Sequence, residues 1–208
     1  MKVAVSFLTS NNIKEDLLKL DKTSTTYIHV DVMDGKFVEK INEPYEEMKD
    51  LSLSKKYDVH LMVEDPIPYI LKYKNLNTEC ITIHHEIDKD VFSLLETIKQ
   101  YGIKCGIAIN PDTDINVLKD YLDKVDLILI MSVFPGKGGQ KFIEESIERV
   151  SKTKQMIKES GRDIIINIDG GINDKTISSV KEVDMVVSGS YVLNKDDFEE
   201  GIQTLINI

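Results

Sequence analysis

Short apolar runs alternate with longer charged stretches along the whole chain. Eight runs are rich in Val and Ile and show no regular polar alternation, which is typical of strands covered on both faces of a parallel sheet. The predicted strands are 3–8, 27–32, 57–63, 80–84, 104–109, 127–133, 164–168 and 185–188.

The stretches between the runs carry apolar residues at helical spacing. Lys99, Lys158 and Lys181 fall near predicted helix C-termini, where cations are favoured, and Gly102 and Gly161 suit the position just beyond a helix end. Helical patterns occur at 65–74, 90–101, 116–122, 143–160 and 174–181.

Eight such units within 208 residues predict a single α/β domain, a (β/α)8 TIM barrel covering 1–208. A doubly wound open sheet is the alternative. It usually needs fewer units, and its Gly-x-Gly-x-x-Gly turn is missing after the first strand, where 9–12 read Thr-Ser-Asn-Asn. No linker or low-complexity tract marks a domain boundary.

Composition and charge argue against nucleic-acid and membrane partners. The formal net charge of −10 gives no electrostatic basis for binding nucleic acid or anionic membranes. No apolar run approaches a membrane span, and no signal peptide is visible. Cys80 and Cys105 lie far apart and form no metal or redox motif. We therefore expect a cytoplasmic protein, with a homo-oligomer left open.

Polar residues stand where the predicted strands end, which is the end at which barrels carry their chemistry. Apolar residues precede the polar one in each case. The polar strand-end residues are Ser6, His29, Asp31, His60, His84 and Asp169, and the apolar Met131 ends the sixth strand.

Four of these residues predict a metal site. His29 and Asp31 are two apart on a strand, so their side chains share a face. If that face is the barrel interior, they converge with His60 and Asp169 into a mixed nitrogen and oxygen set. Such a set suits one divalent metal ion such as Zn, Fe, Mn or Co. The alternative is four unrelated polar residues.

Glycine-rich loops follow the sixth, seventh and eighth predicted strands, at 135–140, 169–171 and 188–190. Glycines let backbone N–H groups wrap an anion, and the last two loops of a barrel are its usual phosphate seat. The first of these loops is flexible enough to act as a lid. A phosphate seat beside two carboxylates and a metal suggests proton transfer next to a carbonyl of a sugar phosphate, through an enediolate. Carboxylates on opposite faces would invert the carbon.

Four motifs carry a resemblance to a known family. They are His-Val-Asp-Val-Met-Asp-Gly at 29–35, Asp-Val-His-Leu-Met-Val at 58–63, Met-Ser-Val-Phe-Pro-Gly-Lys-Gly-Gly-Gln-Lys-Phe at 131–142 and Asp-Gly-Gly-Ile-Asn at 169–173. In order and spacing, from Ser6 to Ser190, the chain resembles the ribulose-phosphate 3-epimerase family. The resemblance implies an isomerase of carbohydrate metabolism that interconverts D-ribulose 5-phosphate and D-xylulose 5-phosphate in the pentose phosphate pathway.

The resemblance also implies residue roles. His29, Asp31, His60 and Asp169 would be metal ligands, with Asp31 and Asp169 as the acid–base pair at C3. Met33, Met62 and Met131 would pack around the reacting carbons, or simply fill the barrel. Substrate contacts would come from Ser6, His60, Gly136, Lys137, Gly138, Gly139, Gly170, Gly171, Gly189 and Ser190.

The chain departs from the family's usual residues around the expected substrate site. The segment 36–40 reads Lys-Phe-Val-Glu-Lys instead of His-Phe-Val-Pro-Asn, and Val5 stands for a proline. Lys137 replaces a common Phe, and Tyr191 replaces a small residue. None removes an expected ligand or base, so the departures concern sugar identity and loop closure. Lys137 would either add a cation near the phosphate or be a solvated loop residue.

Several polar residues outside the motif set receive structural expectations. His84-His85-Glu86 has the composition of a metal cluster. Adjacent residues on a strand point to opposite faces, however, so His84 and His85 cannot both enter the barrel, and a supporting role is expected rather than a second metal site. Asp34 is expected to hold the loop after the second strand. The acidic patches 43–50 and 196–200 are expected to be solvated faces.

Three rival functions remain open. One is an epimerase of a six-carbon ketose phosphate, such as allulose 6-phosphate, by the same mechanism. Another is a sugar-phosphate decarboxylase or aldolase on a related barrel, but 31–34 lack the lysine that such relatives tend to place between the strand-end acids. The third is a non-catalytic phosphate-binding barrel, against which the presence of both Asp and both His speaks.

Overall fold

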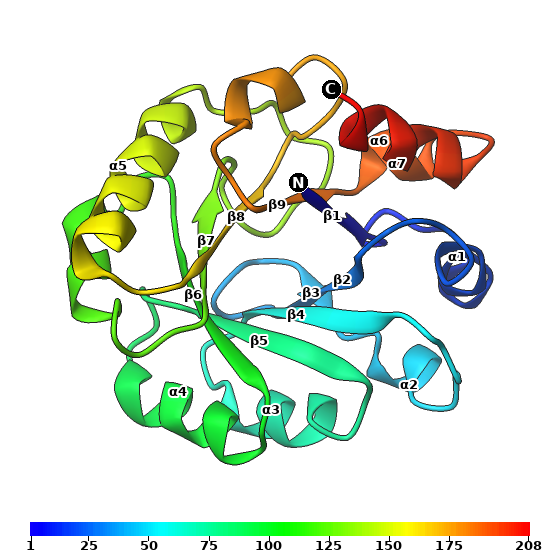
Figure 1. The fold of residues 1–208 in the computed structure, drawn as a ribbon. Helices are drawn as coiled ribbons and strands as arrows, with labels where there is room; N and C mark the ends of the chain where they lie inside the picture. Colours follow the sequence, from blue (N-terminus) through cyan, green and yellow to red (C-terminus); the bar gives the residue numbers. More distant parts are fainter.

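Eight parallel strands close into a barrel in the computed structural model, which describes residues 1–208 (Figure 1). Their order is β1-β9-β8-β7-β6-β5-β4-β2, and pairing of β1 with β2 closes the ring. The predicted (β/α)8 barrel is therefore confirmed. The strands are β1 Lys2–Ser6, β2 Tyr27–Asp34, β4 Lys56–Met62, β5 Thr78–His84, β6 Lys104–Ile109, β7 Leu127–Met131, β8 Ile165–Asp169 and β9 Met185–Ser188.

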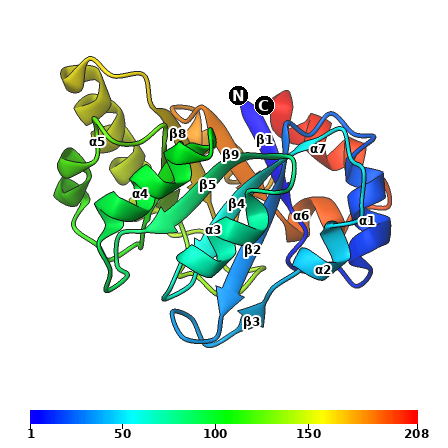
Figure 2. The same ribbon diagram turned by 90° about the horizontal axis from the view of Figure 1, so that it is seen from below.

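Helices form a ring around the barrel, as the end-on and side views show (Figures 1 and 2). The segments expected at 116–122 and 174–181 form short 3₁₀ turns, which suit connections too brief for an α-helix. The outer elements are α1 Ile13–Leu20, α2 Tyr45–Met48, α3 Ile67–Tyr73, α4 Val91–Gln100, η1 Ile115–Asp120, α5 Glu145–Ser160, η2 Ile177–Val180, α6 Ser190–Leu193 and α7 Phe198–Ile206. No helix is long and apolar enough to cross a membrane.

Side chains of each strand divide between the barrel interior and the layer under the helices. On β7, Ile128 and Ile130 belong to the large core cluster, whereas Leu127, Leu129 and Met131 belong to a separate small cluster. This division follows from the alternation of side chains along a strand. The same alternation gives β2 and β4 an interior row of polar residues, which forms the candidate site.

The segment after β2 folds back as a short antiparallel strand, β3 Ile41–Asn42. Asp34 holds this turn, because its carboxylate accepts hydrogen bonds from the backbone N–H groups of Lys36, Phe37 and Glu64. The structural role expected for Asp34 is thus confirmed.

The acidic segment 43–50 is largely the solvated face that its composition suggests, since Glu46 and Asp50 are exposed, but Glu43 is partly buried. It contains α2, and Glu43 accepts hydrogen bonds from Lys72 Nζ at 2.9 Å and from the Tyr73 hydroxyl at 3.1 Å. The expectation was wrong for Glu43 because α3 brings a cation and a phenol to its carboxylate. Segment 196–200 begins α7, with Asp197 capping its N-terminus, and Asp196, Asp197 and Glu200 are exposed as expected.

Candidate functional site

Strand register brings the four expected metal ligands together at the C-terminal end of the barrel. Asp31 on β2 is paired with His60 on β4, and His29 lies two residues before Asp31 on the same interior face. Asp169 ends β8, and only β9 and β1 separate β8 from β2. The ligand atoms of the four residues all lie within 4.8 Å of one another.

The arrangement of atoms fits a divalent cation. His29 Nε2 lies 3.5 Å from Asp31 Oδ1 and 3.7 Å from Asp169 Oδ2. His60 Nδ1 lies 3.5 and 3.8 Å from the same two oxygens. Both nitrogens are buried and have no hydrogen-bond partner in the protein. Two unpaired imidazole nitrogens that face two carboxylates are the donor set expected of a Zn, Fe, Mn or Co site.

The opposite nitrogen of each candidate ligand ring is held by a hydrogen bond. His29 Nδ1 lies 2.8 Å from Asp58 Oδ2, and His60 Nε2 lies 2.8 Å from His84 Nε2. His84 Nδ1 in turn lies 3.0 Å from Glu86 Oε2. Metal-binding histidines commonly have such a partner, which fixes the tautomer and the orientation of the ring.

The supporting role expected for His84 is confirmed, and so is the opposite direction of its neighbour. His84 is fully buried inside the barrel, whereas His85 Nδ1 lies 2.8 Å from the Tyr121 hydroxyl. Burial lowers the pKa of His84 to about 4, against the Glu86 carboxylate, which raises it, so the ring is neutral at pH 7.

Sequence reasoning noted Glu86 beside His84 and His85, but it did not identify the contacts that Asp58 and Glu86 make with the histidines. Asp58 precedes His60 by two residues on β4 and therefore shares its interior face, so period-two alternation was a usable signal for it. Glu86 lies beyond the end of β5, so strand alternation could not predict where its side chain points.

The two candidate acid–base carboxylates have opposite protonation tendencies. Burial raises the pKa of Asp169 to about 7, the Asp31 and Asp58 charges add to the rise, and His29 opposes it. Burial acts in the same direction on Asp31, but the neighbouring His29 and His60 outweigh it and lower the pKa of Asp31. Ser6 Oγ also donates a hydrogen bond of 2.6 Å to Asp31 Oδ2. One carboxyl group is thus arranged to be ionised while the other can carry a proton.

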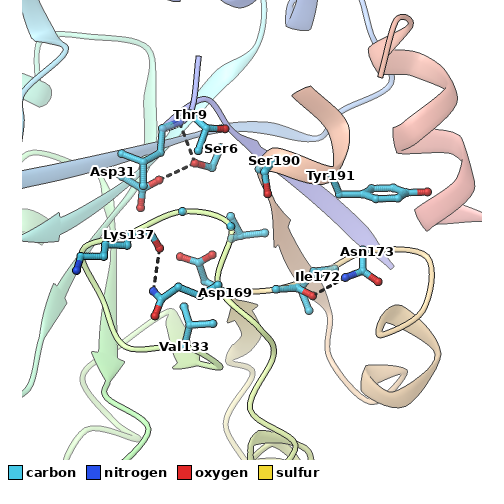
Figure 3. Close-up of a pocket in the computed structure, with 18 of the residues that line it drawn as sticks. Ser6, Thr9, Asp31, Val133, Lys137, Asp169, Ile172, Asn173, Ser190 and Tyr191 are labelled. Carbon is cyan, nitrogen blue, oxygen red and sulfur yellow. Dashed lines mark hydrogen bonds between the residues drawn. The ribbon is translucent and has the colours of Figure 1, made fainter. Parts of the chain in front are cut away.

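A cavity of about 610 Å³ opens above these carboxylates, a size typical of small-molecule sites. In Figure 3, Asp31 and Asp169 enter it from different sides, and Ser190 and Tyr191 stand on a further wall. The predicted residues that line it are Ser6, Asp31, Met33, Met62, Met131, Gly136, Lys137, Gly138, Gly139, Asp169, Gly170, Gly171, Gly189 and Ser190. His29 and His60 lie beneath this lining.

The loops after β7 and β8 support each other at the cavity wall. Ser132 Oγ donates hydrogen bonds to the carbonyl oxygens of Asp169 and Gly170 at 2.8 and 2.7 Å. Gly171 has a φ of +66°, and a Cβ there would lie 2.6 Å from the Phe142 backbone nitrogen. Only glycine combines this backbone conformation with so close an approach.

Lysines are the cationic side chains of the cavity lining. Lys175 and Lys195 accompany Lys137 there. Lys137 is exposed, whereas Lys195 lies 3.6 Å from Glu200. Asp31, Asp169 and Asp174 balance the three lysines in the lining, so the lysines offer cationic partners to an anion without making the cavity positive overall.

Comparison with protein families identifies one matching family. The family model described as "Ribulose-phosphate 3 epimerase family" matches residues 2–193. Among curated proteins, the ribulose-phosphate 3-epimerase of Helicobacter pylori (strain J99) is 38% identical, with 100% of this chain and 98% of the relative covered. That of Bacillus subtilis is 34% identical, with 99% and 98% covered.

Solved structures with the same fold are more distant. A 3-hexulose-6-phosphate synthase from Salmonella typhimurium superimposes with a TM-score of 0.69 at 16% identity, covering 100% of this chain and 97% of that one. A phosphoribosyl anthranilate isomerase from Thermus thermophilus gives a TM-score of 0.69 at 13% identity, covering 100% and 99%. At these identities the likeness concerns the barrel fold alone.

Proposed function

Because the chain belongs to the ribulose-phosphate 3-epimerase family, we propose that it interconverts D-ribulose 5-phosphate and D-xylulose 5-phosphate by inverting C3. The observation that carries the proposal is the pair Asp31 and Asp169, which enter one cavity from different strands, β2 and β8. Inversion at carbon requires a base on one face and an acid on the other.

In the proposed mechanism, ionised Asp31 removes the proton from C3 of D-ribulose 5-phosphate. The C–H electron pair moves into the adjacent carbonyl system and forms an enediolate. Protonated Asp169 then delivers its proton to the opposite face of C3, which gives D-xylulose 5-phosphate. Asp31 ends protonated and Asp169 ionised, which is the arrangement required for the reverse reaction.

One serine and three methionines near the carboxylates assist this proton transfer. Ser6 donates to Asp31 Oδ2, so its hydrogen bond favours the ionised form that acts as a base. Met33, Met62 and Met131 are almost fully buried and line the same cavity. We propose that they exclude water from the reacting carbons, which protects the enediolate from side reactions.

We propose that His29, Asp31, His60 and Asp169 hold one divalent ion. The support is the pair of unpartnered nitrogens, His29 Nε2 and His60 Nδ1, that face the two carboxylates. When bound, the ion supplies positive charge that favours ionisation of a carbon acid next to a carbonyl group.

We place the phosphate group at the glycine loops after β7, β8 and β9. Gly138, Gly139, Gly171 and Ser190 line the cavity and offer backbone N–H groups, and the lysines of the lining carry the complementary charge. Lys137 forms no ion pair within the protein, so its amine is free to approach an anion.

Proton NMR in D₂O tests the proposal directly. Purified protein with added divalent metal should convert D-ribulose 5-phosphate to D-xylulose 5-phosphate with deuterium at C3. Asp169→Asn should abolish conversion without loss of the fold, while Asp163→Asn, an exposed aspartate before β8, should behave as wild type. Conversion by Asp169→Asn at the wild-type rate would refute the two-acid mechanism.

The same spectra separate the alternative substrate. If deuterium is incorporated into allulose 6-phosphate but not into D-ribulose 5-phosphate, the substrate is a six-carbon ketose phosphate and the mechanism is unchanged. We further propose that residues 1–208 form a single catalytic barrel domain and that it acts in the cytoplasm. Two free, buried thiols, Cys80 and Cys105, are in keeping with a reducing compartment.

A further inference from the structure

A chain of hydrogen bonds runs from the candidate metal centre to the outer loops of the barrel. It starts at His60, passes through His84 and reaches Glu86. Glu86 Oε1 accepts hydrogen bonds from the Asn110 backbone N–H at 2.7 Å and from the Thr113 hydroxyl. His60 and His84 are fully buried, so water does not compete for the contact between the two rings.

The turn that supplies the two donors is itself fixed from α5. Arg149 donates hydrogen bonds to the carbonyl oxygens of Thr113 at 2.7 Å and Asn110 at 3.0 Å. Glu86 Oε1 is therefore held by two donors whose turn is fixed in place by Arg149. The other oxygen, Oε2, is left to face His84 Nδ1.

The direction of the donors follows from the chemistry of the groups. An ionised carboxylate only accepts, so His84 Nδ1 must carry the hydrogen. The neutral ring then presents a lone pair at Nε2, and His60 Nε2 must donate to it. His60 is left with a lone pair at Nδ1, the nitrogen that faces Asp31 and Asp169. Each hydrogen position is determined by the one before it.

We propose that Glu86 is a positioning residue that, through His84, fixes the tautomer of His60 with the Nδ1 lone pair directed at the metal centre. The inference rests on the metal site of the proposed function. His29 reaches the same state in one step, because Asp58 contacts its Nδ1 directly. The tautomers of the two candidate imidazole ligands are thus fixed by two carboxylates. Asp58 acts on His29 directly, and Glu86 acts on His60 through the His84 ring.

The substitution Glu86→Gln tests the direction of this chain at nearly constant shape. The amide oxygen must take the place of Oε1, because the Asn110 N–H and the Thr113 hydroxyl there are donors. The amide NH₂ then faces His84 Nδ1 and donates to it. The hydrogen moves to His84 Nε2, His60 Nε2 becomes the acceptor, and a hydrogen on His60 Nδ1 points into the metal centre.

Histidine ¹⁵N NMR reads the tautomers without any metal. The chain has only four histidines, so the long-range ¹⁵N–¹H correlations can be assigned by single substitutions. Wild type should show His60 protonated at Nε2 and His84 at Nδ1. Glu86→Gln should show the reverse, and its zinc affinity, measured by chelator competition, should fall about 10–100-fold.

Glu79→Gln is the matched control. Glu79 is a partly buried carboxylate that pairs with Lys56 at 2.6 Å and Lys104 at 2.8 Å, and all three residues lie at the starts of their strands. The same change there should leave the histidine tautomers and the zinc affinity unaltered.

Two results would overturn the inference. One is a wild-type spectrum with the hydrogen on His60 Nδ1, which decides the matter even if Glu86→Gln does not fold. The other is a folded Glu86→Gln with the tautomers and zinc affinity of wild type. Wild-type protein that binds no zinc, cobalt or manganese would refute the metal site of the proposed function, while the spectra would still decide the role of Glu86.

Discussion

The contact between the loops after β7 and β8 can be measured by adding one methyl group at Gly171. Its φ of +66° lies in the left-handed region, where an alanine costs about 1–2 kcal/mol. A Cβ would also lie 2.6 and 2.9 Å from the backbone nitrogen and Cα of Phe142. Because those atoms are backbone, the loop must move, and overpacking of this kind costs about 1–3 kcal/mol more. Gly171→Ala should therefore lose about 2–5 kcal/mol of unfolding free energy.

Gly161 provides a control with the same backbone conformation. It follows α5 with a φ of +67°, and nothing lies within 4 Å of the position that its Cβ would take. Gly161→Ala should lose only the conformational part, about 1–2 kcal/mol. The difference between the two variants isolates the approach of the β8 loop to Phe142.

Urea denaturation followed by circular dichroism gives both free energies, and a coupled epimerase assay gives kcat and KM. Both loops line the cavity, so displacement of Phe142 should reduce kcat/KM of Gly171→Ala about 10-fold or more, with Gly161→Ala unchanged. Equal stability losses in the two variants, together with wild-type kinetics for Gly171→Ala, would refute the argument.

Three further predictions follow from the site. Ser6→Ala removes a charge-assisted hydrogen bond from Asp31, so kcat should fall about 10–100-fold in the epimerase assay, whereas exposed Ser52→Ala should have no effect. Chelator-treated protein should lose activity yet keep its circular dichroism spectrum. Zinc at about 100 times its Kd should raise the Tm of wild type by about 5–10 °C, and Asp169→Asn should lack this shift. Burial alone would raise the pKa of Glu86, but its hydrogen bonds, with His84 first, lower it to about 2. Ionised Glu86 therefore contributes stability above pH 4.5 that is lost as the pH falls towards 2, at most about 2 kcal/mol after solvent screening. The stability gap between wild type and Glu86→Gln in urea should accordingly be constant from pH about 6 to 5 and shrink by pH about 3; a gap independent of pH would contradict this.

The strands could be predicted from the sequence because their signal is local. Runs of Val and Ile that are buried on both faces leave little choice of structure, and β6 and β9 have the predicted bounds. The residues of the candidate site followed from the rule that parallel strands end at one rim, together with period-two alternation on β2.

The helices α1 and α7 were not identified, although α7 buries Phe198, Ile202 and Leu205 at helical spacing. For α1 a usable signal existed, since Asn12 caps its N-terminus and exchanges hydrogen bonds with Glu15 in a capping pattern. For Glu43 and Glu86 there was none. Glu43 gains its partners from α3, and Glu86 from a turn that α5 holds in place, so both contacts exist only after the barrel has closed.

The barrel interior holds many polar groups, and their energetic cost depends on how each one is paired. His29, Asp31, Asp58, His60 and His84 are all buried, and each unpaired polar atom among them would cost about 1–3 kcal/mol. The protein pairs Nδ1 of His29 and Nε2 of His60, yet leaves the other nitrogen of each ring without a partner. Both orphaned atoms face the same two carboxylate oxygens at 3.5–3.8 Å. In each ring, a hydrogen bond to one nitrogen fixes the orientation, and the other nitrogen faces the same two carboxylates without a partner. This arrangement suits a ligand from outside the chain. A cation is the partner that two lone pairs and two carboxylates can share.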